Sequence, residues 1–239
     1  YVSPLINKNI YDVFHSNLFS TLNIIQLLKN SKIKFKLFIA GSCLMFCSKN
    51  KKLCTEESNI ITTTPYSIAK GSIFQLSRNY KDVYNLHITT GILFNHVSEF
   101  ANTGVVKKII HEIAKINLGK SNELSLGNID IQRDWGYAGD YVKAIHKITQ
   151  NTLPIDYVVG TGVSTSLKKI LRISFNAINK NWDDYVKIDK NLVRRSEENY
   201  LIADPSKIYN ELGWKAEKSI EDIIELMLDY YINFEKKND

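Results

Sequence analysis

The chain has 239 residues, of which 44% are hydrophobic and 23% are charged. This size and balance are typical of one globular domain, or of one domain with an attached lobe, and they exclude a disordered or fibrous chain. The formal net charge is +6, but the lysines are scattered, and the dense cluster at 49–52 falls in an expected loop. We therefore expect no nucleic-acid partner.

No apolar run approaches the roughly 20 residues that span a bilayer, and no signal peptide is recognisable. A soluble cytoplasmic protein without a membrane partner is expected. The cysteines Cys43, Cys47 and Cys54 are odd in number and have no histidine near them in sequence. Neither a disulfide framework nor a zinc site is supported, so we expect no metal and predict buried or half-buried thiols.

Helices and strands are predicted in alternation along the chain. Apolar residues recur at helical spacing from Ile10 to Leu28, and Pro65 suits the first turn of a helix that runs to about Asn85. Further helices are expected at 105–118, 138–150, 167–178 and 220–234. Strands are expected at 36–41, 86–94, 123–126 and 155–160, with loops at 48–64 and 95–103. The alternation predicts an α/β fold with a parallel sheet and helices on both faces.

Tyr66 and Lys70 stand four positions apart in the helix that begins at Pro65, so they share one helix face. A lysine ammonium there favours the phenolate and lowers the pKa of the tyrosine, which makes it a usable proton shuttle near neutral pH. Ser42 ends the apolar strand before this helix, and its hydroxyl can meet the same substrate oxygen. A Tyr-x-x-x-Lys pair is also common on helix surfaces, but the serine at the strand end favours the catalytic interpretation.

More specific segments occur at 65–70, 91–96, 126–136 and 140–142. In this order, and followed by 204–207 and 212–215, they resemble the extended short-chain dehydrogenase/reductase superfamily and, within it, the GDP-mannose 4,6-dehydratases. The resemblance covers nearly the whole chain. It implies a Rossmann-like sheet for NADP (or NAD) over 1–100. It also implies a small C-terminal lobe for the sugar nucleotide over 101–239, with segments that return to the sheet.

The resemblance also implies a lyase reaction. Hydride leaves C4 of the hexose for the nicotinamide, while Tyr66 takes the hydroxyl proton, Ser42 binds the C4 oxygen and Lys70 supports Tyr66 and the nicotinamide ribose. A glutamate then removes the C5 proton, water leaves C6, and the hydride returns to C6. His96 is expected beside the cofactor. Substrate-binding residues are expected to be Asn95, Lys108, Arg133, Arg194 and Glu197, with Arg133 as a diphosphate clamp.

Three departures from the family pattern bear on this chemistry. Leu44 stands where members carry the glutamate base for C5, which leaves Glu56, Glu57 or Tyr66 as candidates. Residues 99–101 replace an Arg-Arg-Gly stretch that helps to bind the cofactor phosphate and to bring subunits together. No glycine-rich dinucleotide fingerprint occurs in the chain, so we expect a sheet that lacks its N-terminal units.

Three functions remain open. The first is a 4,6-dehydratase that acts through NADP on GDP-mannose or a related nucleotide sugar. The second is an NAD(P)-dependent nucleotide-sugar epimerase or reductase, which the loss of the glutamate favours. The third is a catalytically inactive relative or fragment that still binds the sugar nucleotide. A homodimer is implied in which the helices at 10–28 and 66–85 pair across the interface, and a tetramer is the less favoured alternative.

Overall fold

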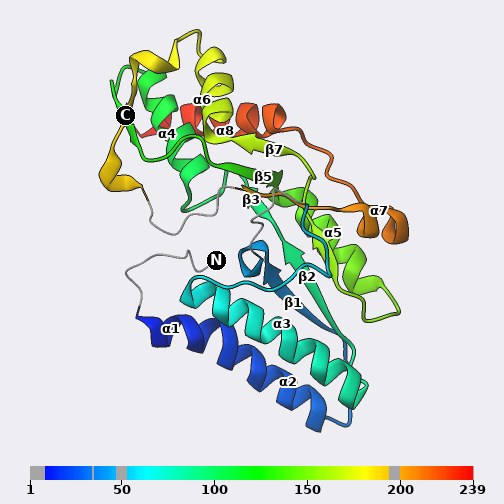
Figure 1. Ribbon diagram of the computed structural model, residues 1–239. Coiled ribbons are helices and arrows are strands. Elements are labelled where there is room, and N and C mark those ends of the chain that lie inside the picture. Colours follow the sequence, from blue (N-terminus) through cyan, green and yellow to red (C-terminus); the bar gives the residue numbers. More distant parts are fainter. Residues whose placement is uncertain (1–8, 34, 47–52, 194–199, 239) are drawn as a thin grey trace.

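A three-stranded parallel sheet in the order β1-β2-β6 organises the first half of the fold (Figure 1). The computed structural model describes residues 9–33, 35–46, 53–193 and 200–238. Within these ranges the sheet strands are β1 (Leu37–Ser42), β2 (Ile88–Leu93) and β6 (Tyr157–Val159). Ser42 lies beside Leu93 in the register, and Leu93 beside Val159. The predicted α/β fold with a Rossmann-like parallel sheet is confirmed.

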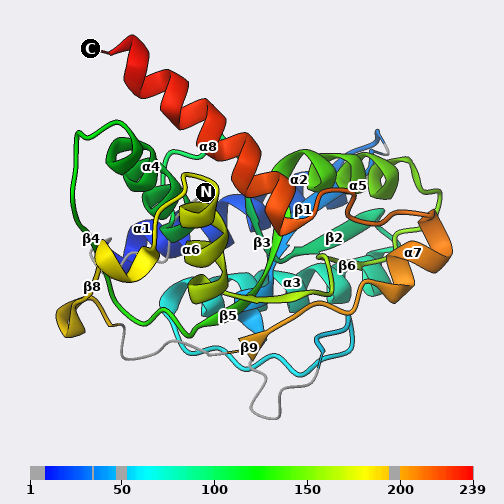
Figure 2. The same ribbon diagram turned by 90° about the horizontal axis from the view of Figure 1, so that it is seen from above.

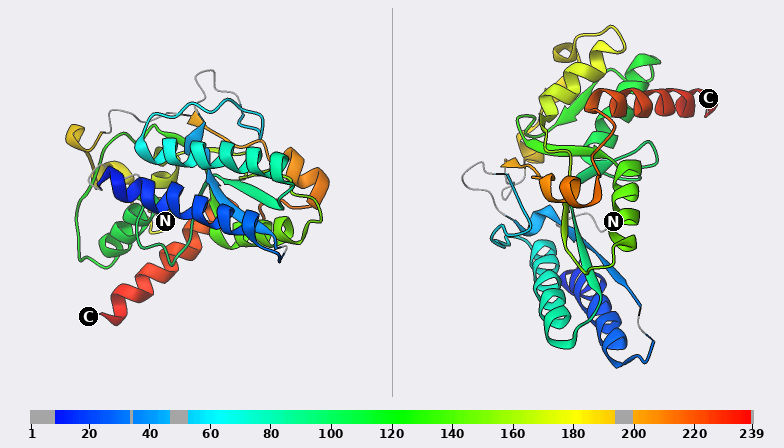
Figure 3. Two further views of the ribbon diagram at one scale, coloured as in Figure 1. Left: turned by 90° about the horizontal axis from the view of Figure 1, so that it is seen from below. Right: turned by 90° about the vertical axis from the view of Figure 1, so that its right-hand side faces the viewer.

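Helices cover both faces of this sheet, as the alternation predicts. Helices α2 (Ser20–Asn30) and α3 (Pro65–Tyr84) run side by side on one face, and α5 (Ala138–Gln150) lies on the other (Figures 1 and 3). Successive strand residues point to opposite faces. Val158 therefore shares a core cluster with Phe74 of α3, whereas its neighbour Val159 packs with Ile148 of α5.

The helix expected from Ile10 to Leu28 is present but is not regular. Its first turns form α1 (Ile10–Phe14), its middle turn His15–Phe19 is π-helical, and it continues as α2. Asn17 in the middle turn is buried, and its side-chain amide donates a hydrogen bond to the carbonyl of Val13 at 3.0 Å. Because that carbonyl is the normal partner within an α-helix, the competition favours a widened turn.

A second, four-stranded sheet contains strands that the sequence does not predict. It is built around β5 (Gln132–Tyr137), which pairs in parallel with β3 (Asn95–Val97) and β9 (Tyr200–Leu201) and antiparallel with β7 (Ser164–Ser166). The loop expected at 95–103 is therefore wrong for its first three residues. A small parallel pair joins β4 (Leu124–Leu126) to β8 (Val186–Ile188).

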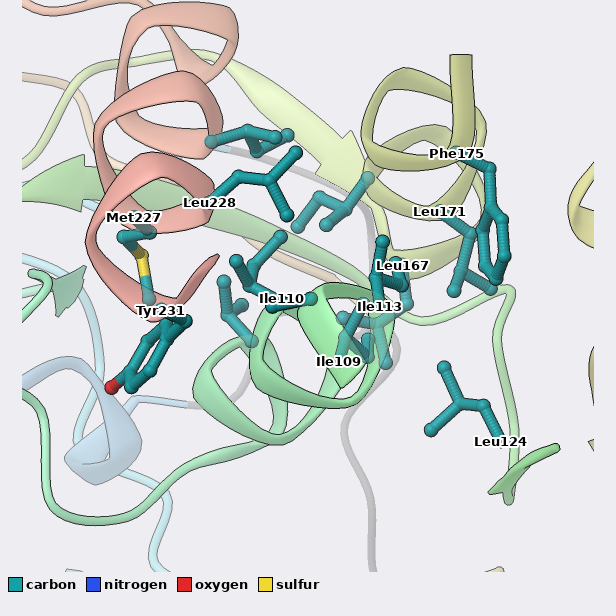
Figure 4. Close-up of a cluster of buried hydrophobic side chains, with 14 of the residues drawn as sticks. Ile109, Ile110, Ile113, Leu124, Leu167, Leu171, Phe175, Met227, Leu228 and Tyr231 are labelled. Atoms are coloured by element: carbon teal, nitrogen blue, oxygen red, sulfur yellow. The ribbon is translucent and has the colours of Figure 1, made fainter. Parts of the chain in front are cut away.

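The C-terminal half has its own core. Helices α4 (Val105–Asn117), α6 (Leu167–Asn176) and α8 (Ile220–Lys237) pack on one another through side chains such as Ile110, Phe175 and Met227 (Figure 4). In contrast, β6 belongs to the first sheet, and α5 and the short α7 (Ser206–Leu212) pack against that sheet. The division at residue 100 stays a prediction.

Three short 3-10 helices complete the described structure: Cys43–Met45, Trp182–Asp184 and Lys190–Leu192. The final turns of α8 project from the body of the molecule (Figure 2). Among the helices in the described ranges, none combines the length and the apolar content needed to cross a lipid bilayer.

Candidate active site

Ser42 is the last residue of β1, at the carboxyl end of the parallel sheet. Open α/β sheets bind their ligands at this end, because the connections leave a crevice there. The Ser42 side chain is buried, and its Oγ accepts a hydrogen bond from the Leu44 N–H at 3.3 Å. The hydroxyl proton therefore stays available for a ligand oxygen.

Helix α3 brings Lys70 to the same strand. Thr64 and Ser67 cap its first turn reciprocally, and Pro65 occupies the first helical position. The Lys70 ammonium donates to the main-chain carbonyl of Ala40 in β1 at 3.0 Å. Farther along the helix, Arg78 meets Asp156, which directly precedes β6, so α3 runs antiparallel to the strands.

This direction places Tyr66 level with Ser42. Tyr66 precedes Lys70 by one turn, about 6 Å along the helix axis. Ser42 follows Ala40 by two residues, about 6.6 Å along the strand, in the same direction. Since Lys70 touches Ala40, Tyr66 reaches the level of Ser42, and the Lys70 Nζ lies 5.8 Å from the centroid of the Tyr66 ring. Tyr66 and Lys70 thus lie beside each other on α3, and Lys70 reaches the strand that ends at Ser42.

The electrostatic setting of Lys70 follows from its burial. The side chain is half-buried, and this burial lowers the pKa of its ammonium below the usual value. A main-chain carbonyl and the face of the Tyr66 ring compensate for part of the lost hydration. The ammonium is therefore held beside the phenol, in a place from which it can also donate to ligand hydroxyls.

Asn95 and His96 begin strand β3 and lie against Tyr141 of α5. The His96 ring is 4.9 Å from the Tyr141 ring, and His96 Nδ1 lies 2.9 Å from the carbonyl oxygen of Phe94. That contact requires the proton on Nδ1, which leaves Nε2 as an acceptor. Burial is the main cause that lowers the pKa of His96, so the neutral ring is favoured.

Asn95 offers a donor that the described protein does not use. Its main-chain carbonyl accepts a hydrogen bond from the Tyr141 hydroxyl at 3.4 Å, which fixes the backbone. Its side-chain Nδ2 is buried and has no hydrogen-bond partner among the described residues. Because buried polar groups are rarely left unpaired, this amide is suited to a ligand oxygen.

Arg133 lies in the central strand β5, is buried, and donates from Nη1 to the carbonyl of Gln132 at 2.9 Å. Its charge also acts on Cys43, the residue after Ser42. Burial raises the pKa of the Cys43 thiol to about 12, and the Arg133 charge opposes that rise. Cys43 and Cys54 are both buried, and Cys47 lies outside the described residues.

Asp134, the next residue of β5, forms a clasp between three segments. Its carboxylate accepts hydrogen bonds from the N–H and hydroxyl of Thr161, from Gly162 N–H at 2.8 Å and from Ala203 N–H at 3.2 Å. Gly160 permits this approach, since a Cβ there would lie 2.9 Å from Asp134 Oδ2. Burial raises the pKa of Asp134, and these hydrogen bonds oppose the rise. The Asp134 carboxylate therefore joins strand β5 to the main chain at Thr161 and Gly162 and at Ala203.

The remaining predicted substrate residues are not brought to this edge by an observed contact. Lys108 is exposed on α4, and its ammonium donates to the carbonyl of Ser125 at 2.7 Å, which ties α4 to β4. Arg194 and Glu197 lie outside the described residues. All three roles stay predictions.

The structure gives both candidate glutamate bases other partners. Glu56 is buried, and its Oε1 accepts the N–H of Val158 in β6, at 2.7 Å. Because β6 is two strands from β1, this contact lies about 10 Å across the sheet from the Ser42 strand. Glu57 is exposed and pairs with Arg78. Of the three candidate bases, Tyr66 is the one that lies beside Lys70.

Two positioning residues were not expected from the sequence. Tyr141 packs on His96 and bonds to Asn95, and its neighbour Asp140 accepts the N–H groups of Glu217 and Lys218. The signal is the Asp-Tyr-Val segment at 140–142, which supports the resemblance but has no role assigned from the sequence.

Comparison with known proteins identifies the family. The sequence model of GDP-mannose 4,6 dehydratase matches residues 8–227. The chain belongs to this family. GDP-mannose 4,6 dehydratase 1 of Arabidopsis thaliana is 37% identical over 203 residues, which cover 84% of this chain and 56% of that relative. The chain thus spans little more than half the length of this relative.

Solved structures show the same fold at lower identity. RMD from Pseudomonas aeruginosa, complexed with NADPH, has a TM-score of 0.82 and 19% identity, and the match covers 96% of this chain and 80% of that one. The dTDP-glucose 4,6-dehydratase of Bacillus anthracis, in complex with NAD, has a TM-score of 0.82 and 18% identity, with 97% and 72% covered.

Proposed function

We propose that the chain carries the catalytic edge of a sugar-nucleotide 4,6-dehydratase of the GDP-mannose type that works through NADP. The observation that supports this most strongly is the contact of Lys70 both with β1, the strand that ends at Ser42, and with the Tyr66 ring. Membership of the family, and the names of its relatives, support the class of substrate.

The residues at this edge fit the nicotinamide end of NADP, or of NAD. The half-buried Lys70 ammonium suits ribose hydroxyls, and His96 presents an acceptor nitrogen next to the sheet. The bound cofactor would supply a reversible hydride acceptor. The similar structures from Pseudomonas and Bacillus contain NADPH and NAD, respectively. No glycine-rich fingerprint occurs in the 239 residues, so we assign no residue to the cofactor diphosphate.

In this proposal Tyr66 takes the proton of the C4 hydroxyl while the Ser42 hydroxyl donates to the same oxygen. The positive charge of Lys70 stabilises the phenolate that the step requires. Asn95 Nδ2 donates to an oxygen of the substrate, and Arg133 binds its diphosphate. Lys108, Arg194 and Glu197 are proposed as outer nucleotide contacts.

One observation favours a second function, an NAD(P)-dependent epimerase or reductase of a nucleotide sugar. Leu44 cannot accept the C5 proton, and Glu56 and Glu57 are bound to partners elsewhere. Oxidation at C4 needs only the tyrosine, serine and lysine, whereas elimination of water needs a further base. A catalytically inactive nucleotide-sugar-binding relative is the third outcome that the test below distinguishes.

We also propose a homodimer formed through the helices at 10–30 and 65–84. These helices expose large apolar side chains, among them Tyr11, Leu27 at 68% exposure, and Val83. Pairing two copies would remove this surface from water. The tetramer is less favoured, because Glu99 and Phe100 replace the arginines of the family pattern.

Proton NMR of the chain incubated with NADP and GDP-mannose in deuterated water tests the proposal. A 4-keto-6-deoxy sugar with deuterium at C5 would support the dehydratase. A changed hexose that keeps its C6 hydroxyl would assign the epimerase. Binding of GDP-mannose without any conversion would refute both enzymes and leave the binding protein.

A further inference from the structure

An open pocket of about 200 Å³ lies in the C-terminal half of the fold. Its lining residues come from the turn after β3, from α4 and from the last turns of α8. Its lining includes Glu99, Phe100, Lys107, His111, Tyr230 and Phe234. None of the residues assigned above to the sugar or the cofactor lines it. Figure 4 shows the neighbouring Tyr231 at the border of the helical core, with its hydroxyl turned away from the labelled isoleucines.

Glu99 brings an incompletely satisfied carboxylate to this pocket. The side chain is only 9% exposed, and its Oε1 accepts a long hydrogen bond from the Tyr137 hydroxyl, at 3.4 Å. Its Oε2 is buried and has no hydrogen-bond partner in the part of the chain that the structure describes. Burying a charged acceptor without a donor is unfavourable, so the site is suited to a donor from outside the chain.

The charge of the Glu99 carboxylate contributes to the raised pKa of two tyrosine hydroxyls. Burial is the largest cause that raises the pKa of Tyr137, and the Glu99 charge adds to it. Burial also raises the pKa of Tyr231, with smaller contributions from Tyr230 and Glu99. The turn that carries Glu99 is fixed to α8, because the Tyr231 hydroxyl donates to the carbonyl of Ala101 at 3.3 Å.

Aromatic rings form the outer wall. Phe100 is 70% exposed and meets the Tyr230 ring edge-on at 5.6 Å, and Tyr230 stacks with Phe234 at 6.4 Å. The faces of such rings attract cations. A carboxylate behind exposed aromatic rings is the combination that binds organic cations.

Lys107 is the cation in the lining. Its ammonium donates to His111 Nδ1 at 3.2 Å and lies 5.7 Å from the centroid of the Tyr231 ring. His111 Nε2 donates to Glu235 at 2.6 Å, and Lys120 also pairs with Glu235, at 3.2 Å. Glu99 Oε2 receives none of these hydrogen bonds.

We propose that this pocket binds a small organic cation, either a guanidinium or a primary ammonium, as a free small molecule. An N–H of the cation donates to the Glu99 carboxylate, and the apolar body of the cation lies against Phe100 and Tyr230. This site is independent of the proposed dehydratase chemistry, and its test does not depend on turnover.

Isothermal titration calorimetry of the chain with butylguanidinium, and with its neutral isostere butylurea, tests the proposal. We expect saturable binding of butylguanidinium and about tenfold weaker binding of butylurea. Glu99→Gln should weaken butylguanidinium binding about tenfold, because it removes the charge and keeps the shape. The matched control is Glu225→Gln, which removes the same charge from an exposed position on α8 and should leave binding unchanged.

Phe100→Ala is the second variant, and its exposure makes a folding defect unexpected. It should weaken butylguanidinium binding without changing the net charge. Absence of saturable binding would overturn the proposal, as would equal binding of butylurea. Equal affinities of the wild type and Glu99→Gln would also overturn it.

Discussion

Exchanging the Asp134 carboxylate for an amide is expected to lower the free energy of unfolding by about 2–4 kcal/mol. In Asp134→Asn, the remaining oxygen can still serve Thr161. The new amide group then faces the N–H groups of Gly162 and Ala203, which now bond to Oδ2 at 2.8 and 3.2 Å. Each buried N–H that loses its acceptor costs about 1–3 kcal/mol, which gives about 2–6 kcal/mol for the pair.

Part of this loss is offset. Burial raises the pKa of Asp134, which shows that the fold disfavours its ionised form, and the neutral asparagine avoids that penalty. Urea denaturation followed by circular dichroism measures the net effect. Asp130→Asn, at an exposed position on the approach to the same strand, is the control and should change stability by less than about 0.5 kcal/mol. If Asp134→Asn were as stable as this control, the hydrogen bonds that join β5 to the turn after β6 and to Ala203, just after β9, would not stabilise the fold.

Three further predictions address the site, the assembly and the second core. Tyr66→Phe should lower turnover about 10²–10⁴-fold, because it removes the proton acceptor, while calorimetry should show unchanged GDP-mannose binding. Leu27→Glu should convert a dimer into a monomer in light scattering, whereas the same kind of change at the exposed Val142 of α5 should not. The hydrogen bond from His111, and then Lys120, lowers the pKa of Glu235 below 4.5. Its stabilisation is therefore fully present above about pH 4.5 and is lost as the pH falls through that lowered pKa, so Glu235→Gln should flatten thermal stability against pH in this window. A variant with the wild-type pH profile would contradict this assignment.

The regular helices and the buried strands could be predicted because their apolar periodicity is strong. The helix expected from Pro65 to Asn85 is observed as Pro65–Tyr84, and the apolar strand before Ser42 is β1. The same periodicity predicts helices on both faces of the sheet. Each of these elements is specified by residues that are close in sequence. The apolar pattern alone is therefore sufficient to predict them.

The second sheet could not be predicted in this way. Strand β5 has the sequence Gln-Arg-Asp-Trp-Gly-Tyr, which shows no alternation of apolar side chains. Its buried carboxylate at Asp134 is stabilised by donors at Thr161 and Ala203, far away in the sequence. Short pairings such as those of β7 and β9 depend on the same distant contacts.

The candidate site likewise has features that the sequence predicts and features that only the fold shows. The Tyr-x-x-x-Lys spacing and the strand-end serine predict Ser42, Tyr66 and Lys70 as a group, and their catalytic role stays a prediction. The contact between Lys70 and the Ala40 carbonyl could not be predicted, because it depends on how α3 lies on β1. The sequence also could not exclude Glu56 as a base, since only the fold shows it bound to the N–H of Val158.

We propose that this chain oxidises a hexose at C4 and returns the hydride to C6. The most direct test is to incubate the chain with NADP and GDP-mannose that carries deuterium at C4, and to locate the deuterium by NMR. The proposed reaction gives a 4-keto-6-deoxy sugar with the deuterium at C6. Recovery of bound GDP-mannose with its deuterium still at C4 would contradict it.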